Sequence, residues 1–146
     1  MIFDMDESAY RQIVSATNPR LCPFEKSVLT HCAACSKAEK HNIAEREIVL
    51  CEDADALADC AVLRDALRRN FMFALGRTHA GEPLPHAQEL RVQCGGLTGL
   101  QIALDGEHRV GDVAALVAMA RQRFGDWEDF PYAQIVVSAN IYYKSR

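Results

Sequence analysis

The chain has 146 residues, of which 49% are hydrophobic and 25% are charged, with a net charge of −4 and a pI near 5.7. This length and composition fit one globular domain, residues 1–146, and exclude disorder as the default state. The basic residues are scattered, which argues against nucleic-acid binding. No apolar run approaches the roughly 20 residues of a membrane span, and the acidic N-terminus does not resemble a signal peptide. We therefore expect a cytosolic protein that binds neither nucleic acid nor membranes.

The N-terminal part of the chain is predicted to be helical. A first helix is expected over residues 6–17, ended by the residue pair Asn18-Pro19. A second helix is expected to begin beside Cys22 and to continue to about residue 41. It would place Cys32 and Cys35 one turn apart on a single face, among apolar neighbours.

The clearest helical pattern covers residues 53–75. Acidic residues precede and open it, and apolar residues recur every three or four positions until Gly76, which can close it. Because Cys60 belongs to this apolar stripe, its thiol should point into the core. Cys51 lies just before the helix, where peptide N–H groups favour a thiolate. Residues 43–50 are expected to be a link.

The C-terminal half follows a loop over residues 77–88. Apolar residues alternate over 90–104, which predicts a β-hairpin, with a short strand running into a glycine-initiated helix as the alternative. The glycines in this stretch do not match a phosphate-binding loop and indicate tight backbone geometry. A helix is expected from Asp112 to Gly125, and another over 131–143. The sequence therefore predicts a mainly α, compact single-domain protein with one small β element.

Five of the six cysteines fall within residues 22–60, and only Cys94 lies outside this cysteine-rich region. In a reducing cytosol, grouped thiols are typical of metal binding or redox chemistry rather than of a disulfide framework. Buried cysteines can also act as small hydrophobic residues, but such residues have no reason to cluster. The candidate ligands are Cys22, Cys32, Cys35, Cys51 and Cys60.

An iron–sulfur cluster, [4Fe–4S], is the favoured occupant because it takes four thiolates in a water-poor pocket. The spacing C-x2-C-x15-C-x8-C resembles that of high-potential iron–sulfur proteins, although its last gap is shorter and this chain is more helical. One of the five thiols is surplus, and Cys22 and Cys32 are the best candidates for it. The predicted function is electron transfer, or sensing of redox state or oxygen, with a redox or regulatory protein partner.

Two alternatives remain open. Zinc could bind the same cysteines, with His31 or His41 as a further ligand, and stabilise an interaction module without a redox role. Thiol–disulfide chemistry through Cys32 and Cys35 is disfavoured, because such a pair normally opens a helix after a strand. The sequence contains no convincing set of catalytic residues, so an enzyme is not expected.

Overall fold

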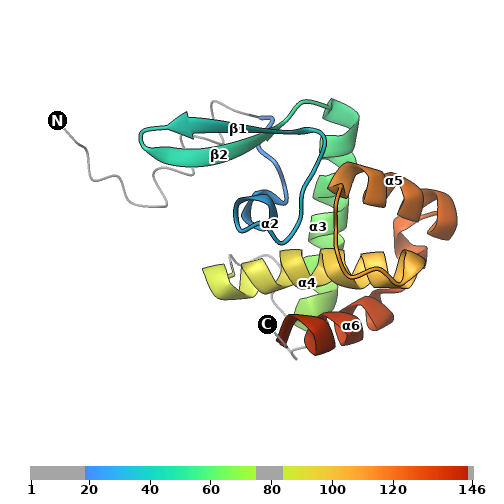
Figure 1. Ribbon diagram of the computed structural model, residues 1–146. Coiled ribbons are helices and arrows are strands. Elements are labelled where there is room, and N and C mark those ends of the chain that lie inside the picture. Colours follow the sequence, from blue (N-terminus) through green and yellow to red (C-terminus); the bar gives the residue numbers. More distant parts are fainter. Residues whose placement is uncertain (1–18, 75–83, 145–146) are drawn as a thin grey trace.

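The computed structural model describes residues 19–74 and 84–144, and it confirms a mainly α fold with a small two-stranded sheet (Figure 1). The helix predicted over 6–17 lies outside the described residues. The elements, in chain order, are α2 (Glu25–Leu29), β1 (Ala38–Ile43), β2 (Arg46–Cys51), α3 (Ala54–Ala74), α4 (His86–Asp105), α5 (Val113–Phe124), the 3-10 helix η1 (Trp127–Asp129) and α6 (Tyr132–Lys144).

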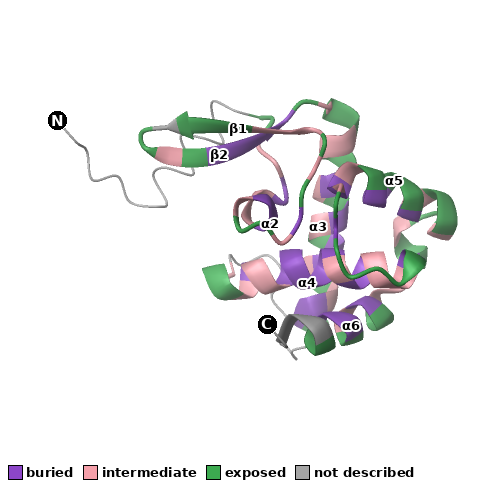
Figure 2. Ribbon diagram, viewed as in Figure 1, coloured by how far each residue is buried: buried purple, intermediate pink, exposed green. Residues whose placement is uncertain are grey.

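The core lies where the four longer helices meet. Helix α4 packs most extensively on α6 and also contacts α2, α3 and α5. Figure 2 shows the buried positions gathered on the facing sides of α3 and α4, while the hairpin extends to one side. The largest fully buried side chains on these four helices are Leu63, Leu67, Leu97, Leu100, Leu116 and Ile135.

Three of the predicted helices are confirmed, and capping residues explain where α3 begins and where α5 begins and ends. At the start of α3, Asp53 Oδ1 accepts hydrogen bonds from the backbone N–H groups of Asp55 and Ala56, at 3.0 and 3.1 Å. Asp112 caps α5 in the same way, accepting from the N–H of Ala114. Gly125, with φ of 85°, ends α5. The segment predicted over 131–143 forms α6.

The hairpin predicted over residues 90–104 is wrong, because this segment lies within α4. Its glycines are needed where α4 meets other helices closely. A Cβ on Gly96 would lie 2.7 Å from Leu67 Cδ1 of α3, and a Cβ on Gly99 would lie 2.5 Å from the backbone oxygen of Ile135 of α6. Packing between helices therefore outweighs the low helix propensity of glycine.

The long second helix is also wrong, because α2 ends at Leu29. His31 has φ of 63°, its N–H donates to the oxygen of Val28, and the N–H of Cys32 donates to the oxygen of Ser27. These two bonds form a Schellman motif, which closes a helix at a left-handed residue that is usually glycine. Because histidine occupies that position here, the sequence carries no clear stop signal.

The small sheet lies at residues 38–51, where a helix end and a link were expected. Strands β1 and β2 are antiparallel, with Ala38 opposite Cys51 and Ile43 opposite Arg46. The two turn residues, Ala44 and Glu45, have φ of 50° and 68°. Two consecutive left-handed residues form the two-residue turn of a tight β-hairpin. This turn usually has the sequence Asn-Gly or Asp-Gly. That signal is missing from this sequence.

None of the helices in the described ranges combines the length and apolar character that crossing a membrane requires.

Candidate functional site

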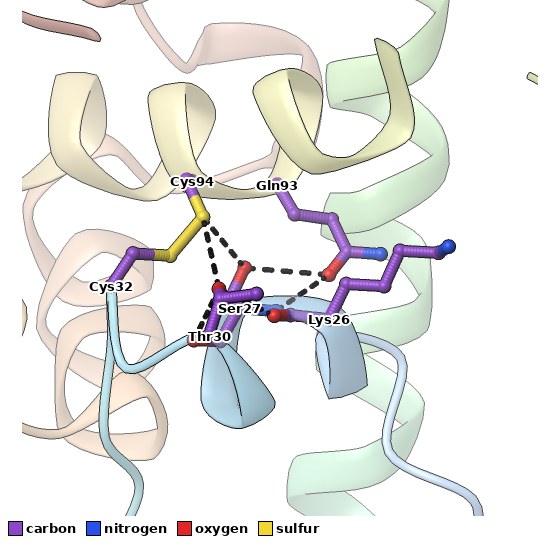
Figure 3. Close-up of a disulfide and its surroundings, with 6 residues drawn as sticks. All are labelled: Lys26, Ser27, Thr30, Cys32, Gln93 and Cys94. Carbon is purple, nitrogen blue, oxygen red and sulfur yellow. Dashed lines mark hydrogen bonds between the residues drawn. A yellow bond between two sulfur atoms is a disulfide. The ribbon is translucent and has the colours of Figure 1, made fainter. Parts of the chain in front are cut away.

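A disulfide joins Cys32, in the turn after α2, to Cys94 in α4 (Figure 3). The two Cα atoms lie 5.9 Å apart, within the normal range for such a bond, and the residues are 62 positions apart in sequence. Cys94 is only 3% exposed, whereas Cys32 is half-buried. Cys32 is therefore the more exposed end of the disulfide, and Cys94 is the buried end.

Polar groups surround the buried sulfur. The hydroxyl oxygens of Ser27 and Thr30 lie 3.8 and 3.9 Å from Sγ of Cys94 (Figure 3). Ser27 donates its hydroxyl proton to Gln93 Oε1, which also accepts from the Ser27 backbone N–H, at 3.3 and 3.2 Å. Thr30 donates to the backbone oxygen of Lys26 at 2.7 Å. Both hydroxyls thus donate elsewhere and present lone pairs toward the sulfur.

An ion pair between the buried Glu89 and the partly exposed Arg68 fixes Gln93 in this orientation. Its Nε2 donates to Glu89 at 2.9 Å, and Glu89 accepts two bonds from the guanidinium of Arg68, at 2.8 and 2.9 Å. Burial alone would raise the pKa of Glu89, but the hydrogen bonds from Arg68 and Gln93 outweigh it and lower that pKa. Gln93 must therefore present its oxygen, not its nitrogen, to Ser27.

The other four cysteines of the cysteine-rich region line one small apolar pocket between the hairpin, α3 and the start of α5. Residues 20–22 pair with β2: Leu21 forms an antiparallel bridge with Leu50, and the N–H of Cys22 donates to Val49. Alternation along these strands places Cys22 and Cys51 on the same face. Cys60 reaches the pocket from α3.

Cys35 reaches this pocket because the backbone between it and Cys32 is extended. Ala33 forms a parallel bridge with Val110, and the N–H of Ala34 donates to the oxygen of Val110. Successive residues of an extended chain alternate sides, so residues three apart face opposite ways. Cys32 therefore points to α4 and Cys35 to the pocket. The prediction that Cys32 and Cys35 lie on one face of a helix is therefore wrong.

Burial keeps three of the four pocket thiols protonated. It raises the pKa of Cys22 to about 12, with smaller increases from the charges of Cys35 and Cys51. Burial, followed by the neighbouring thiols, also raises the pKa of Cys60. For Cys35, burial raises the pKa against hydrogen bonds from backbone N–H groups. These three thiols are neutral at pH 7 and correspondingly unreactive.

The predicted iron–sulfur centre is not supported and has to be corrected. Among the residues placed by the structure, no group of three or more His, Cys, Asp or Glu side chains could hold a metal ion. The space between the four pocket thiols is about 10 Å³, room for roughly one water molecule and far less than four irons and four sulfides need. Cys32 is consumed by the disulfide. The prediction of cluster-based electron transfer or sensing is therefore wrong, and the geometry does not favour the zinc module either.

Sequence reasoning missed four members of the disulfide site. Cys94 lies far from the other cysteines in sequence and was not a candidate ligand, and Ser27, Thr30 and Gln93 were not singled out. The available signal was weak: Gln93 and Cys94 are adjacent, inside a segment whose pattern favoured a strand. Comparison with protein-family models, curated proteins and solved structures gave no match. The function is therefore argued from the geometry alone.

The raised pKa of Cys22 predicts a loss of stability in alkaline solution. Its ordinary value is 9.0 and its folded value is about 12, so its contribution is complete below pH 9.0 and is lost as the pH rises toward 12. The expected slope is about 1.4 kcal/mol per pH unit for each such thiol. Urea unfolding of the parent and of Cys22→Ala above about pH 9 tests this. The variant should show the shallower decline, and parallel curves would contradict the assignment.

Proposed function

We propose that this protein is a two-electron thiol–disulfide redox protein, in which the Cys32–Cys94 couple exchanges with a dithiol protein partner. The observation that carries the proposal is the environment of Cys94, where a buried sulfur faces hydroxyl oxygens whose own protons are bonded elsewhere. Such an arrangement suits a thiol as well as a disulfide. Both oxidation states can then be held in one fold.

The difference in exposure decides which sulfur reacts. Cys32 is half-buried and Cys94 is 3% exposed, so an incoming thiolate attacks Sγ of Cys32. The S–S bond breaks, a mixed disulfide forms at Cys32, and Cys94 leaves as a thiolate that takes up a proton. The second thiol of the partner then attacks the mixed disulfide and releases the Cys32 thiol. Two electrons and two protons pass to the couple, and the partner ends as a disulfide.

The reduced state is provided with a hydrogen-bond acceptor. A thiol on Cys94 can donate to Ser27 Oγ, because the Ser27 hydroxyl already donates to Gln93. Gln93 cannot turn away, since Glu89 holds its amide nitrogen. The buried thiol is therefore satisfied, and reduction leaves no orphaned polar group in the core.

Reduction also releases a mechanical link. The disulfide is the covalent tie between α4 and the segment that leads from α2 into β1. Beyond it, this segment is held by the bridge of Ala33 to Val110 and by the bond from the Ser36 N–H to Asp112. The proposed couple therefore sets how firmly the hairpin region is attached to the helical core.

Variants that keep only one cysteine of the couple can show which of the two sulfurs reacts faster. Cys94→Ala leaves Cys32 as a free thiol, and Cys32→Ala is the matched variant that leaves Cys94. With glutathione disulfide, Cys32 should form a mixed disulfide at least about tenfold faster than Cys94, as followed by peptide mapping. The four pocket cysteines serve as internal references. Equal rates at the two positions, or faster reaction at Cys94, would overturn the proposed mechanism.

A further inference from the structure

Reduction of the Cys32–Cys94 bond places a negative charge where water has little access. When a thiolate attacks Cys32, the sulfur of Cys94 leaves as a thiolate, yet this residue is only 3% exposed. A buried anion without hydrogen-bond donors is costly, so the rate of exchange depends on what stabilises this sulfur and how a proton reaches it. The hydroxyls of Ser27 and Thr30 both lie against it (Figure 3).

These two hydroxyls differ in their access to solvent. Ser27 is fully buried, and its hydroxyl lies between Gln93 and Cys94. Thr30 is an exposed residue that follows the last residue of α2, and its Oγ1 lies 3.9 Å from Sγ of Cys94. A proton that left the buried Ser27 hydroxyl could not readily be replaced from water, whereas one that left Thr30 could. Thr30 therefore connects the buried sulfur to solvent.

The Thr30 hydroxyl can turn toward this sulfur without leaving its present acceptors unpaired. In the disulfide form it donates to the backbone oxygen of Lys26 at 2.7 Å, and the backbone oxygen of Ser27 lies 3.4 Å away. The Lys26 oxygen also accepts from the backbone N–H of Thr30, and the Ser27 oxygen accepts from the N–H of Cys32, both at 3.1 Å. Turning exchanges a bond to a neutral oxygen for a charge-assisted bond to a thiolate, which is the stronger kind.

We propose that Thr30 is a catalytic residue of the exchange reaction, which donates a hydrogen bond to the departing Cys94 thiolate and relays a solvent proton to it. This inference rests on the proposed function, because it concerns the same couple. As the S–S bond breaks, the Thr30 hydroxyl turns to Sγ of Cys94 and its proton passes to the sulfur. Thr30 then takes a proton from the solvent on its outer side. This proton balances the one that the incoming thiol lost on ionising, so Thr30 ends unchanged.

The same residue assists the reverse reaction. When the couple closes, the Cys94 thiol gives its proton to Thr30, which releases one to solvent, and the thiolate attacks the mixed disulfide at Cys32. Ser27 has a different role, since its oxygen accepts from the neutral Cys94 thiol and so stabilises the reduced state. A donor aimed at a charge that exists only during the reaction accelerates both directions and leaves the equilibrium unchanged.

The test compares Thr30→Val, which removes the hydroxyl and keeps the shape of the side chain, with Thr30→Ser, which keeps the hydroxyl. Reduction of the full chain by dithiothreitol measures one direction, and closure of the mixed disulfide between Cys32 and glutathione measures the other. A hydrogen bond to a charged sulfur favours the thiolate by about tenfold or more. Because a less acidic thiol is also the better nucleophile, Thr30→Val should lower both rates by at least about threefold. The equilibrium ratio with dithiothreitol should stay within about twofold of the parent value.

The pH profile of closure separates catalysis from a structural effect. Closure requires the Cys94 thiolate, so Thr30→Val should move the profile to higher pH by about one unit, whereas Thr30→Ser should keep the profile and the rates of the parent. Circular dichroism checks the fold of each variant. Equal rates in Thr30→Val and the parent, or slower rates with an unshifted profile, would overturn the role of Thr30 and leave the couple intact. A parent disulfide that neither yields to dithiothreitol nor closes from the mixed disulfide would overturn the proposed function itself, and this inference with it.

Discussion

Loss of the Cys32–Cys94 disulfide is expected to lower the free energy of unfolding by about 4 kcal/mol. The bond joins residues 62 positions apart, so it removes a large loop-closure entropy from the unfolded chain. This is a large fraction of the roughly 5–15 kcal/mol by which a globular domain is stable. Guanidinium unfolding of the oxidised parent, the reduced parent and the Cys32→Ala/Cys94→Ala variant measures the effect.

The reduced parent separates this entropic effect from packing. The reduced parent keeps both sulfur atoms, so its lower free energy of unfolding measures the effect of the cross-link alone. The double variant also loses side-chain contacts at Cys94, which is 3% exposed. We expect the double variant to be the less stable of the two. A difference below about 1 kcal/mol between the oxidised and reduced parent would show that the disulfide does not constrain the fold as described.

Gly99→Ala is expected to destabilise the protein by about 2–3 kcal/mol, although alanine favours a helix by about 1 kcal/mol over glycine. The new Cβ would lie 2.5 Å from the backbone oxygen of Ile135, so α4 and α6 would have to separate. This contact between α4 and α6 is the largest in the fold. Thermal or denaturant unfolding of the variant measures the cost.

Two other glycines provide the controls. A Cβ on Gly111 meets no atom within 4 Å, so Gly111→Ala should change stability little. Gly96→Ala should lie between the two, because its nearest neighbour is the side chain of Leu67, which can move. If Gly99→Ala were as stable as Gly111→Ala, the close packing of α4 on α6 would be wrong.

Helices whose ends carry local signals could be predicted from the sequence. Asp53 and Asp112 act as caps from within their own segments, and Gly125 closes α5 through its own backbone freedom. The stripe of α3, including Cys60 and Leu63, is buried as its spacing predicts. In each case the determining interactions lie within a few residues of one another.

The wrong predictions have a different cause. There the structure depends either on an unusual backbone conformation or on a contact with a residue far away in sequence. The turn at Ala44 and Glu45 and the helix end at His31 use left-handed residues without glycine or asparagine. The glycines of α4 break a helical pattern in sequence, yet Gly99 is required by α6, which follows later in the chain. Single-sequence patterns cannot register such contacts.

The candidate site could also be predicted only in part from the sequence. The grouping of cysteines in residues 22–60 correctly indicated that they meet, and four of the five line one pocket. The pairing of Cys32 with Cys94 could not be predicted, because it depends on an extended backbone at Ala33 and on α4 replacing a hairpin. Once Cys32 faces α4 and Cys35 faces the pocket, the chelate that the C-x2-C spacing suggested is lost.

A redox titration with thiol counting tests the central claim most directly. The full chain is equilibrated over a range of dithiothreitol ratios, its free thiols are alkylated, and each cysteine is quantified by peptide mapping. Our account predicts one reversible two-electron transition confined to Cys32 and Cys94, while Cys22, Cys35, Cys51 and Cys60 stay thiols throughout. It would be contradicted by free thiols at both Cys32 and Cys94 in the oxidised protein, or by a disulfide that does not re-form between them after reduction.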